Sequence, residues 1–471
     1  MSPFEPADLE QLAASGITEA EAERQLRLLT GPPPHVELAR ACRIGDGILP
    51  LDRAEDPART AACAAAASAG RLSAFIPASG AATRMFESLL ATLQEETDRA
   101  ALAQLAGAGD RHAADTLRFA HHWRELALAD ELGVALRARG ETVSSGLEWL
   151  STLLSPKGLG YAERPKALIP FHLTARGARS AFEEHLAEAA GYLADAARVC
   201  RVHFTIAPEH RAAIDRHLST VRAELESRSD VHFEVSFSYQ ERASDTVAVD
   251  LAGRPFRNAD GSLVLRPGGH GALLRNLQAY AAAGGDIVFI KNIDNVVPER
   301  SRSFLARWQQ ILGGHLLQIQ EELFAHLERL ESAEIGREDL AAALAFAEGR
   351  LGYHPARSMR SLRPEEWRRS LQSRLDRPLR VCAVVRSEGQ PGGGPFWVDD
   401  REGEDRPQIV ESAEVDHDSE SQSEIWSSST HFNPVNLVCA LRDRRQQPYD
   451  LSRYRDPEAV FVSTKSSGGR R

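Results

Sequence analysis

LSAFIPASGAATRMF, residues 72–86, is the stretch that decides the fold. Its apolar run, residues 72–76, predicts a buried strand, and residues 77–80 predict a loop of small residues. A helix is expected from about Ala82. The chain therefore passes here from a strand, through a tight loop, to the N-terminus of a helix.

Such a loop suits a phosphate group. The first backbone N–H groups of a helix have no partner within the helix, and the helix dipole places partial positive charge there. Arg84 adds a fixed cation with a planar fork of donors. The same pattern is common where Gly and Ser serve packing at strand-to-helix joints, so the loop alone leaves both interpretations open.

The chain uses lysine sparingly. Lys and Arg together number 56, of which only four are Lys: Lys157, Lys166, Lys291 and Lys465. Because an ammonium and a guanidinium are not interchangeable at a phosphate, we expect lysine to be kept where a compact charge is needed. Lys166, Lys291 and Lys465 each lie beside an expected strand.

The composition is that of an ordinary globular protein, with 42% hydrophobic residues. A formal net charge of −11 argues against nucleic acid or an anionic membrane as the main partner. No apolar run approaches the roughly 18 residues that span a bilayer, and the N-terminal MSPFEPADLE does not have the pattern of a signal peptide. We therefore expect a cytoplasmic protein without a nucleic acid or membrane partner, and leave homo-oligomer formation open.

Four regions are expected along the chain. Residues 1–70 predict a helical N-terminal region, and residues 71–300 predict the core, with a helical insertion at 87–155. Residues 301–378 predict a further helical segment, and residues 379–471 predict a β-rich part.

Helix and strand patterns alternate in the second half of the core. The expected order is helix 181–197, strand 201–206, helix 209–228 and strand 231–237. This order implies a parallel sheet with helical crossovers, in which ligands bind at the carboxyl ends of the strands. The fold class is therefore α/β.

Eight short motifs occur in one order: SGAATRM, RPKALIPF, FSYQ, RPGGHGALL, IKNIDN, QIVES, HFNPVNL and STKSSGG. In this order they resemble the nucleotidyltransferases that make nucleotide sugars, most nearly the UDP-sugar pyrophosphorylase branch. Nearly the whole chain also resembles a bacterial family catalogued as a domain of unknown function, DUF4301. The resemblance implies a Rossmann-like mixed sheet of the nucleotide-diphospho-sugar transferase type, with helices on both faces and a C-terminal β-rich part that completes the sugar side of the site.

The resemblance also implies a role for each matching residue. These are Arg84, Lys166 and Lys465 as catalytic cations; Ser79, Gly80, Gln240, Gly268, Gly269, His270 and Gly271 as nucleotide-binding residues; Glu411, Asn433 and Asn436 as acceptor-binding residues; and Asp294 as the metal ligand. Magnesium fits a lone aspartate, since this hard cation keeps waters and takes only one or two carboxylates. The alternative for Asp294 is a turn residue at the end of a strand.

The function expected from these matches is nucleotidyl transfer from a nucleoside triphosphate to a phosphorylated sugar or cyclitol, with release of pyrophosphate. Uridine is the expected base, because the Gln240 amide offers a donor and an acceptor to an imide edge. Two alternatives stay open: a glycosyltransferase that uses a nucleotide sugar, and a non-catalytic nucleotide-binding protein on the same fold. The lysine and arginine set favours the handling of a free triphosphate.

Overall fold

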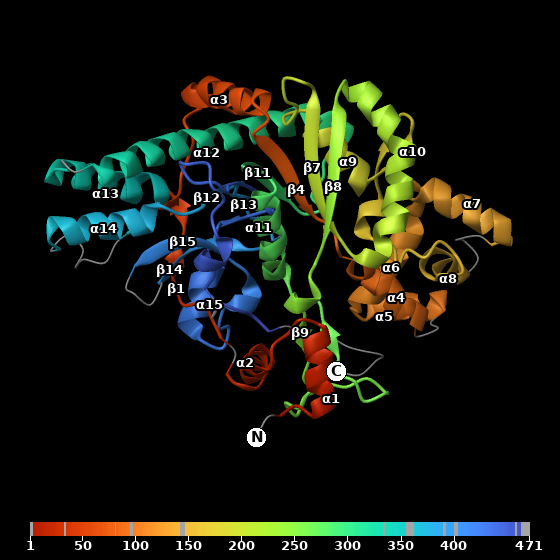
Figure 1. Cartoon of the computed structure of the whole chain (residues 1–471). Helices are drawn as coiled ribbons and strands as arrows, with labels where there is room; N and C mark the ends of the chain where they lie inside the picture. Colours follow the sequence, from red (N-terminus) through yellow and green to blue (C-terminus); the bar gives the residue numbers. More distant parts are fainter. Residues whose placement is uncertain are drawn as a thin grey trace. The chain divides into compact units, whose positions relative to one another are not determined.

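The computed structural model is shown in Figure 1. It describes residues 3–32, 34–80, 82–94, 98–141, 147–332, 335–354, 362–389, 392–399, 404–456 and 459–462. The chain divides into two compact units, each discontinuous in sequence. Unit 1 comprises residues 1–73, 240–290 and 310–471, and unit 2 comprises residues 74–239 and 291–309.

Three parallel strands form the sheet of unit 2: the end of β4 (Leu72–Pro77), β7 (Val199–Ile206) and β8 (His232–Tyr239). Ala74 lies opposite Val202, and the pairing continues in register to Pro77 and Thr205. The crossover helices α9 (Ala181–Ala189) and α10 (Arg211–Ser229) alternate with these strands along the chain. The alternation expected from the sequence is thus confirmed.

Strand β11 (Ile287–Lys291) extends this parallel arrangement on the other edge of β4. In unit 1 the Ile287 N–H donates to the Arg71 carbonyl, and in unit 2 the Ile293 N–H donates to the Pro77 carbonyl. Because the partners advance together along both segments, β4 and β11 run parallel. The full strand order is β12-β17-β11-β4-β7-β8, with β12 and β17 antiparallel. The sheet is therefore mixed, and the α/β fold class is confirmed.

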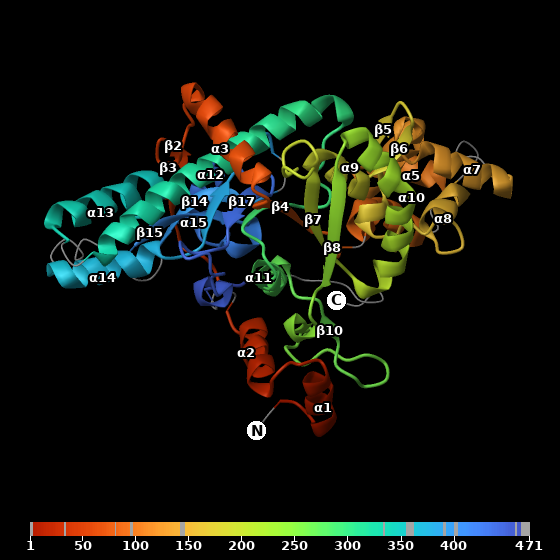
Figure 2. The same ribbon diagram turned by 45° about the horizontal axis from the view of Figure 1, so that its top comes forward.

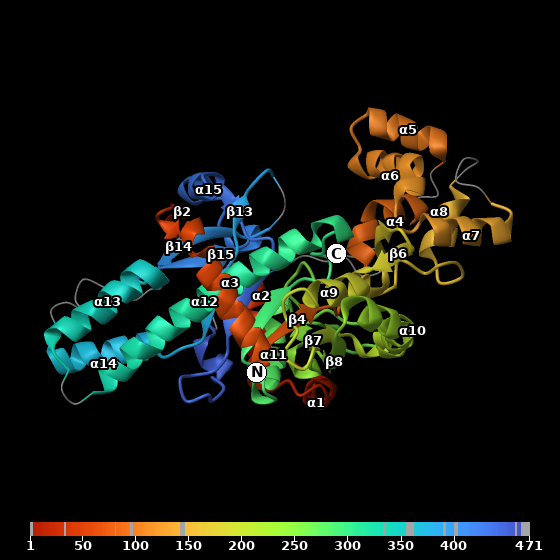
Figure 3. The same cartoon turned by 90° about the horizontal axis from the view of Figure 1, so that it is seen from above.

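The helical insertion expected after β4 is also confirmed. Its helices gather together at one end of unit 2 in Figure 3. The helices are α4 (Glu87–Gln94), α5 (Arg99–Gly107), α6 (Arg111–His122), α7 (Ala129–Arg139) and α8 (Glu148–Leu154). All of them except α5 contribute to a core that includes Phe86, Trp123, Trp149 and Tyr161.

In unit 1, the second half of a long helix packs with two shorter helices, as Figure 2 shows. The three are α12 (Arg302–Glu331), α13 (Arg337–Leu351) and α14 (Pro364–Leu375). Leu323, Leu344 and Leu371, one from each helix, lie in their common core. The helical segment expected at 301–378 is therefore present in the described residues.

The N-terminal region is only partly helical, which corrects the expectation for residues 1–70. Helices α1 (Pro6–Ala14), α2 (Glu19–Thr30) and α3 (Asp56–Ser68) are present, but residues 38–41 form strand β1. Although Leu, Ala and Arg favour helix in isolation, β1 pairs antiparallel with β14 (Gly394–Asp399), which pairs in turn with β15 (Asp405–Val410). Burial of Leu38 against Phe396 thus overrides local propensity.

The remaining helices and strands are short. They are β2 (Arg43–Ile44), β3 (Gly47–Ile48), β5 (Pro170–Thr174), β6 (Gly177–Ser180), β9 (Thr246–Val247), β10 (Leu265–Arg266), α11 (Leu274–Ala282), β12 (Leu379–Cys382), β13 (Val385–Arg386), α15 (Glu420–Ser427), β16 (His431–Phe432) and β17 (Asn436–Ala440). Within the described ranges, no helix is long and apolar enough to cross a membrane.

Two helical glycines provide a test of the packing in unit 1. A Cβ at Gly314 on α12 would lie 1.9 Å from the backbone oxygen of Arg59 on α3, whereas a Cβ at Gly349 on α13 meets nothing within 4 Å. We expect Gly314→Ala to lower the free energy of unfolding by about 1–3 kcal/mol or more, because the helices must separate. Gly349→Ala should raise it by roughly 0.5–1 kcal/mol, since alanine favours helix. Chemical denaturation of both variants measures these changes in the free energy of unfolding. Equal changes in the two variants would contradict the close packing of α12 against α3.

His203 on β7 predicts a pH dependence of stability. Its ring lies between the Ser236 and Ser238 hydroxyls, at 2.8 Å from each, and burial lowers its pKa from 6.5 to about 4. The unfolded chain therefore takes up a proton below pH 6.5 that the folded chain takes up only near pH 4. The stability from neutral His203 is complete above pH 6.5 and is lost as the pH falls toward 4. In calorimetry, the Tm of His203→Gln should fall less steeply than that of wild type as the pH is lowered from 6.5 to 4. The same slope in both proteins would contradict the role of His203.

Candidate functional site

The loop after β4 is held by backbone contacts and is open on one side. The Ala78 N–H donates to the Thr205 carbonyl at 2.8 Å. Ser79 is half-buried, Gly80 is exposed, and a Cβ at Gly80 would meet no described atom within 4 Å. The chain continues as a 3₁₀ turn, Ala82–Phe86, before α4 begins at Glu87, so the α-helix starts later than expected. The side chain of Arg84 lies outside what the structure describes.

The chain returns to this loop after the helical insertion. The Lys166 N–H donates to the Gly80 carbonyl at 3.2 Å, and the Ala82 N–H donates to the Arg164 carbonyl at 3.1 Å. The Arg164 guanidinium is fixed by Glu131 at 2.9 Å and stacks over Tyr161. Burial would raise the pKa of Glu131, but hydrogen bonds from Arg164 and Tyr161 outweigh it and lower the pKa. The backbone of the RPK motif therefore lies directly against the glycine loop.

Lys166 and Asp294 meet at the carboxyl ends of β4 and β11. The Lys166 Nζ donates to the Asp294 Oδ2 at 2.7 Å, although the residues are 128 positions apart. Their side chains are 21% and 39% exposed, so the pair faces solvent on one side. Asp294 lies in a turn closed by the Asn295 N–H and the Asn292 carbonyl. A half-exposed pair of opposite charges beside an open glycine loop can receive a phosphorylated ligand.

A divalent metal at Asp294 is compatible with this geometry. In the described part of the chain, the Asp294 Oδ1 makes no hydrogen bond, and no three His, Cys, Asp or Glu side chains form a metal cluster. Magnesium does not need such a cluster, because one carboxylate, waters and ligand phosphates can complete its octahedron. The exposed carboxylate therefore fits Mg²⁺ better than a metal that requires several protein ligands.

The predicted nucleotide-binding loop lies in unit 1. The Gln240 Nε2 donates to the Gly268 carbonyl at 3.1 Å, so this side chain holds the loop. A Cβ at Gly268 would lie 2.5 Å from the Ser244 oxygen, whereas Gly269 and Gly271 face open space. His270 begins a 3₁₀ turn ahead of α11, and its side chain lies outside the described atoms.

The predicted acceptor-binding residues also lie in unit 1. Glu411 is exposed, and its N–H donates to the Glu414 carboxylate at 2.7 Å. Asn433 is buried, and its amide donates to the Ala383 carbonyl at 2.6 Å while its Oδ1 accepts from the Val435 N–H at 2.9 Å. Asn433 therefore fixes a turn in which Val435 adopts a φ of +53°. Asn436 follows this turn as the first residue of β17.

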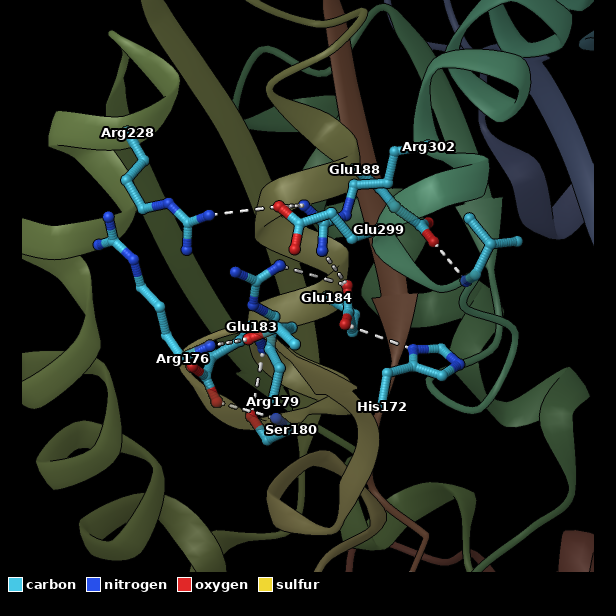
Figure 4. A network of polar contacts seen from close by, with 12 residues as sticks. His172, Arg176, Arg179, Ser180, Glu183, Glu184, Glu188, Arg228, Glu299 and Arg302 are labelled. Atoms are coloured by element: carbon cyan, nitrogen blue, oxygen red, sulfur yellow. Dashed lines mark hydrogen bonds and ion pairs between the residues drawn. The ribbon is translucent and has the colours of Figure 1, made fainter. Parts of the chain in front are cut away.

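Sequence reasoning missed three polar residues of α9 that bind the segment carrying Asp294: Glu184, His185 and Glu188. Figure 4 shows Glu184 with Arg302 and also labels Glu188. All three side chains are less than 5% exposed. One signal was available in AFEEHLAEAA, where apolar residues occur around the whole helix and leave no solvent-facing side for the charges. Lys465, the last expected cation, lies outside the described residues.

The fold and this site together define a mixed α/β protein with a lysine–aspartate pair at the carboxyl ends of its parallel strands. The chain belongs to the family described as Domain of unknown function (DUF4301), whose model matches residues 5–471. The family resemblance found in the sequence is thereby confirmed. Comparison with curated proteins gives no sequence match.

Solved structures with some similarity include two from Trypanosoma brucei. One is the uridine diphosphate N-acetylglucosamine pyrophosphorylase, with a TM-score of 0.41 and 12% identity, over 93% of this chain and 62% of that one. The other is a UDP-glucose phosphorylase, with a TM-score of 0.37 and 11% identity, over 92% of this chain and 62% of that one. The chain thus spans less than two thirds of the length of either. The strand order of the sheet, and not these similarities, defines the fold.

The glycine loop of unit 1 gives a test with a matched control. Gly268→Ala should displace the loop, because its Cβ would overlap the Ser244 oxygen, whereas Gly269→Ala adds a methyl group in open space. Hydrogen exchange should be faster across residues 266–274 in Gly268→Ala than in Gly269→Ala. Identical exchange in the two variants would show that the Gln240 contact does not depend on this backbone path.

Proposed function

We propose that this chain is a nucleotidyltransferase. It would transfer a nucleotidyl group, uridylyl by expectation, from a nucleoside triphosphate to a sugar-1-phosphate or a related cyclitol phosphate. The observation that carries the proposal is the Lys166–Asp294 pair, which lies beside the open Gly80 loop at the carboxyl ends of two parallel strands. This is where α/β proteins bind nucleotides.

The chemistry asks for positioning and charge stabilisation. An oxygen of the acceptor phosphate attacks the α-phosphorus, the bond to the bridging oxygen breaks, and pyrophosphate leaves with that electron pair. Two anions must therefore be held together while negative charge moves toward the leaving group. The Lys166 ammonium is placed to bind phosphate oxygens, and we assign the same task to Arg84 and Lys465. The Ser79–Gly80 loop would let phosphate approach the backbone closely.

Asp294 would hold Mg²⁺, which supplies charge neutralisation and orientation of the phosphate groups. Asp294 also orients Lys166 through their ion pair. The role of the protein at this position is thus to hold one carboxylate and one ammonium at a fixed separation.

We assign recognition of the two substrates to the other predicted residues. Gln240 and the loop 268–271 would bind the base, with the Gln240 donor shared with the Gly268 carbonyl. Glu411 would hydrogen-bond acceptor hydroxyls. Asn433 would shape that region through the turn it fixes, and Asn436 follows directly. The enzyme would act in the cytoplasm, without nucleic acid or membrane as a partner.

A pyrophosphate-release assay tests the function. Wild-type protein is incubated with Mg²⁺, each of the four nucleoside triphosphates and a panel of sugar-1-phosphates and cyclitol phosphates. Release that requires both substrates supports the proposal, and the fastest release with UTP supports the uridylyl assignment. Hydrolysis or transfer from nucleotide sugars alone would indicate a glycosyltransferase, and nucleotide binding without turnover would indicate a binding protein.

Asp294→Asn is the decisive variant. Asparagine keeps the size of aspartate, but it removes the negative charge that attracts the metal and that pairs with the Lys166 ammonium. We expect kcat to fall about 100-fold or more, as for the loss of one electrostatic anchor in such sites. Asp418→Asn is the control, because Asp418 is exposed and its side chain has no partner among the described residues. Full turnover in Asp294→Asn would show that Asp294 does not bind the metal.

A further inference from the structure

Three side chains of α9 contact the segment that carries Asp294. Glu184, His185 and Glu188 lie within two turns of one helix, and their partners lie between residues 291 and 302. Both elements belong to unit 2. Because polar side chains are rarely buried without partners, this concentration requires an explanation.

Glu188 binds the segment at two points. One carboxylate oxygen accepts from the Lys291 ammonium, and the other accepts from the Val297 N–H at 2.7 Å. Glu188 and Lys291 are 4% and 2% exposed, so the pair is shielded from water. Burial raises the pKa of Glu188, and the Lys291 ammonium opposes that rise. Asp294 lies between the two points at which Glu188 holds the chain.

His185 holds the middle of the same segment. Its Nε2 lies 3.1 Å from the Asn292 and Ile293 carbonyl oxygens. Since carbonyls only accept, this nitrogen carries the proton. Burial lowers the pKa of His185 to about 3, and the nearby Lys291 charge acts in the same direction, so the ring is neutral at pH 7. These two carbonyls directly precede Asp294 in the chain.

Glu184 holds the far end of the segment. Its side chain is fully buried and accepts from Arg302 at 2.8 Å, with Arg179 and His172 close by. Figure 4 shows these groups converging on Glu184. The start of α12 is thereby tied to the same helix that holds Lys291 and Val297.

Stability alone does not account for this arrangement. Removing ions from water is costly, and a well-packed apolar pair is often as stable as a buried ion pair or more so. What an ion pair adds is a fixed geometry, because each partner is penalised when it moves away from the other. The geometry fixed here is that of residues 291–297.

We propose that Glu188, together with Lys291 and His185, is a positioning residue that holds Asp294 opposite Lys166. A catalytic role for this positioning rests on the proposed function. The positioning itself can be tested without any nucleotide or metal.

The scarcity of lysine supplies the readout. Brief acetylation followed by mass spectrometry reports each lysine separately, and the exposed Lys157 serves as the internal reference. Contact with Asp294 should shield Lys166 from the reagent, so Asp294→Asn should raise the Lys166-to-Lys157 labelling ratio at least threefold. No rise in this variant would show that the ion pair is absent in solution and would overturn the inference.

The central variant is the double substitution Glu188→Leu with Lys291→Met. Replacing both ions by apolar side chains avoids an unpaired buried charge, so Tm should stay within several degrees of wild type. The Lys166 labelling ratio should nevertheless rise as in Asp294→Asn. Glu188→Gln with Lys291→Met keeps the acceptor for the Val297 N–H and should give a smaller rise. A wild-type ratio in the first double variant would refute the positioning role, and unfolding of that variant would refute the claim that the pair serves geometry more than stability.

Glu404→Gln is the matched control. Glu404 is a buried carboxylate of unit 1 that binds Arg374 at 2.8 Å, so its loss is chemically comparable but should leave the Lys166 ratio unchanged. If wild-type protein releases pyrophosphate, the first double variant should lose about 100-fold in kcat, as expected for a misplacement of about 1 Å, with little change in KM for the triphosphate. If wild-type protein has no transferase activity, the proposed function fails while the labelling result still decides the positioning role.

Discussion

Backbone pairing at the carboxyl end of β4 is the constraint on which the candidate site depends. Between Pro77 and Gly80, main-chain groups bond to three separate parts of unit 2: Thr205 near the end of β7, Ile293 after β11, and Lys166 after the insertion. Main-chain hydrogen bonds do not depend on the side chains that the partners carry. Lys166 and Asp294 therefore meet because one short stretch of backbone gathers the segments that hold them.

Exposure changes steeply over a few residues of the segment after β11. The Lys291 side chain is 3% exposed, whereas that of Asp294 is 39% exposed. Electrostatic interactions are stronger where water is excluded, so the inner contacts are stiff, while the outer carboxylate remains accessible to ligands. A functional side chain needs both properties at once: a backbone held rigidly by its surroundings and a terminal group that a ligand can reach.

Much of unit 2 could be predicted because its signals are local. The apolar run before Pro77 and the alternation after Ala181 identified the parallel strands, and the few lysines drew attention to Lys166. Strand β1 could not be predicted, since the four residues that form it become a strand only through pairing with β14, far away in sequence. Local propensity carries no information about such a partner.

The role of α9 was hidden for a similar reason. A run of Glu, Glu and His on a helix is ordinarily a solvated face. The apolar residues around α9 indicate burial, but only the folded position of residues 291–302 shows which groups its charges bind. The contacts of Gln240 and Asn433 were likewise beyond sequence reasoning. Their amides match motif positions, but which backbone carbonyl each one binds is a property of the folded loops.

The insertion after β4 leaves and rejoins the sheet at almost the same point, since Ala82 and Arg164 share a hydrogen bond. It also has an apolar interior of its own, built around Trp149 and Tyr161. A segment with neighbouring ends and a separate interior can be gained, lost or exchanged without disturbing the strands that flank it. Length variation among relatives of this protein should therefore concentrate between these two residues, and a short linker in their place should leave the glycine loop and the RPK motif next to each other.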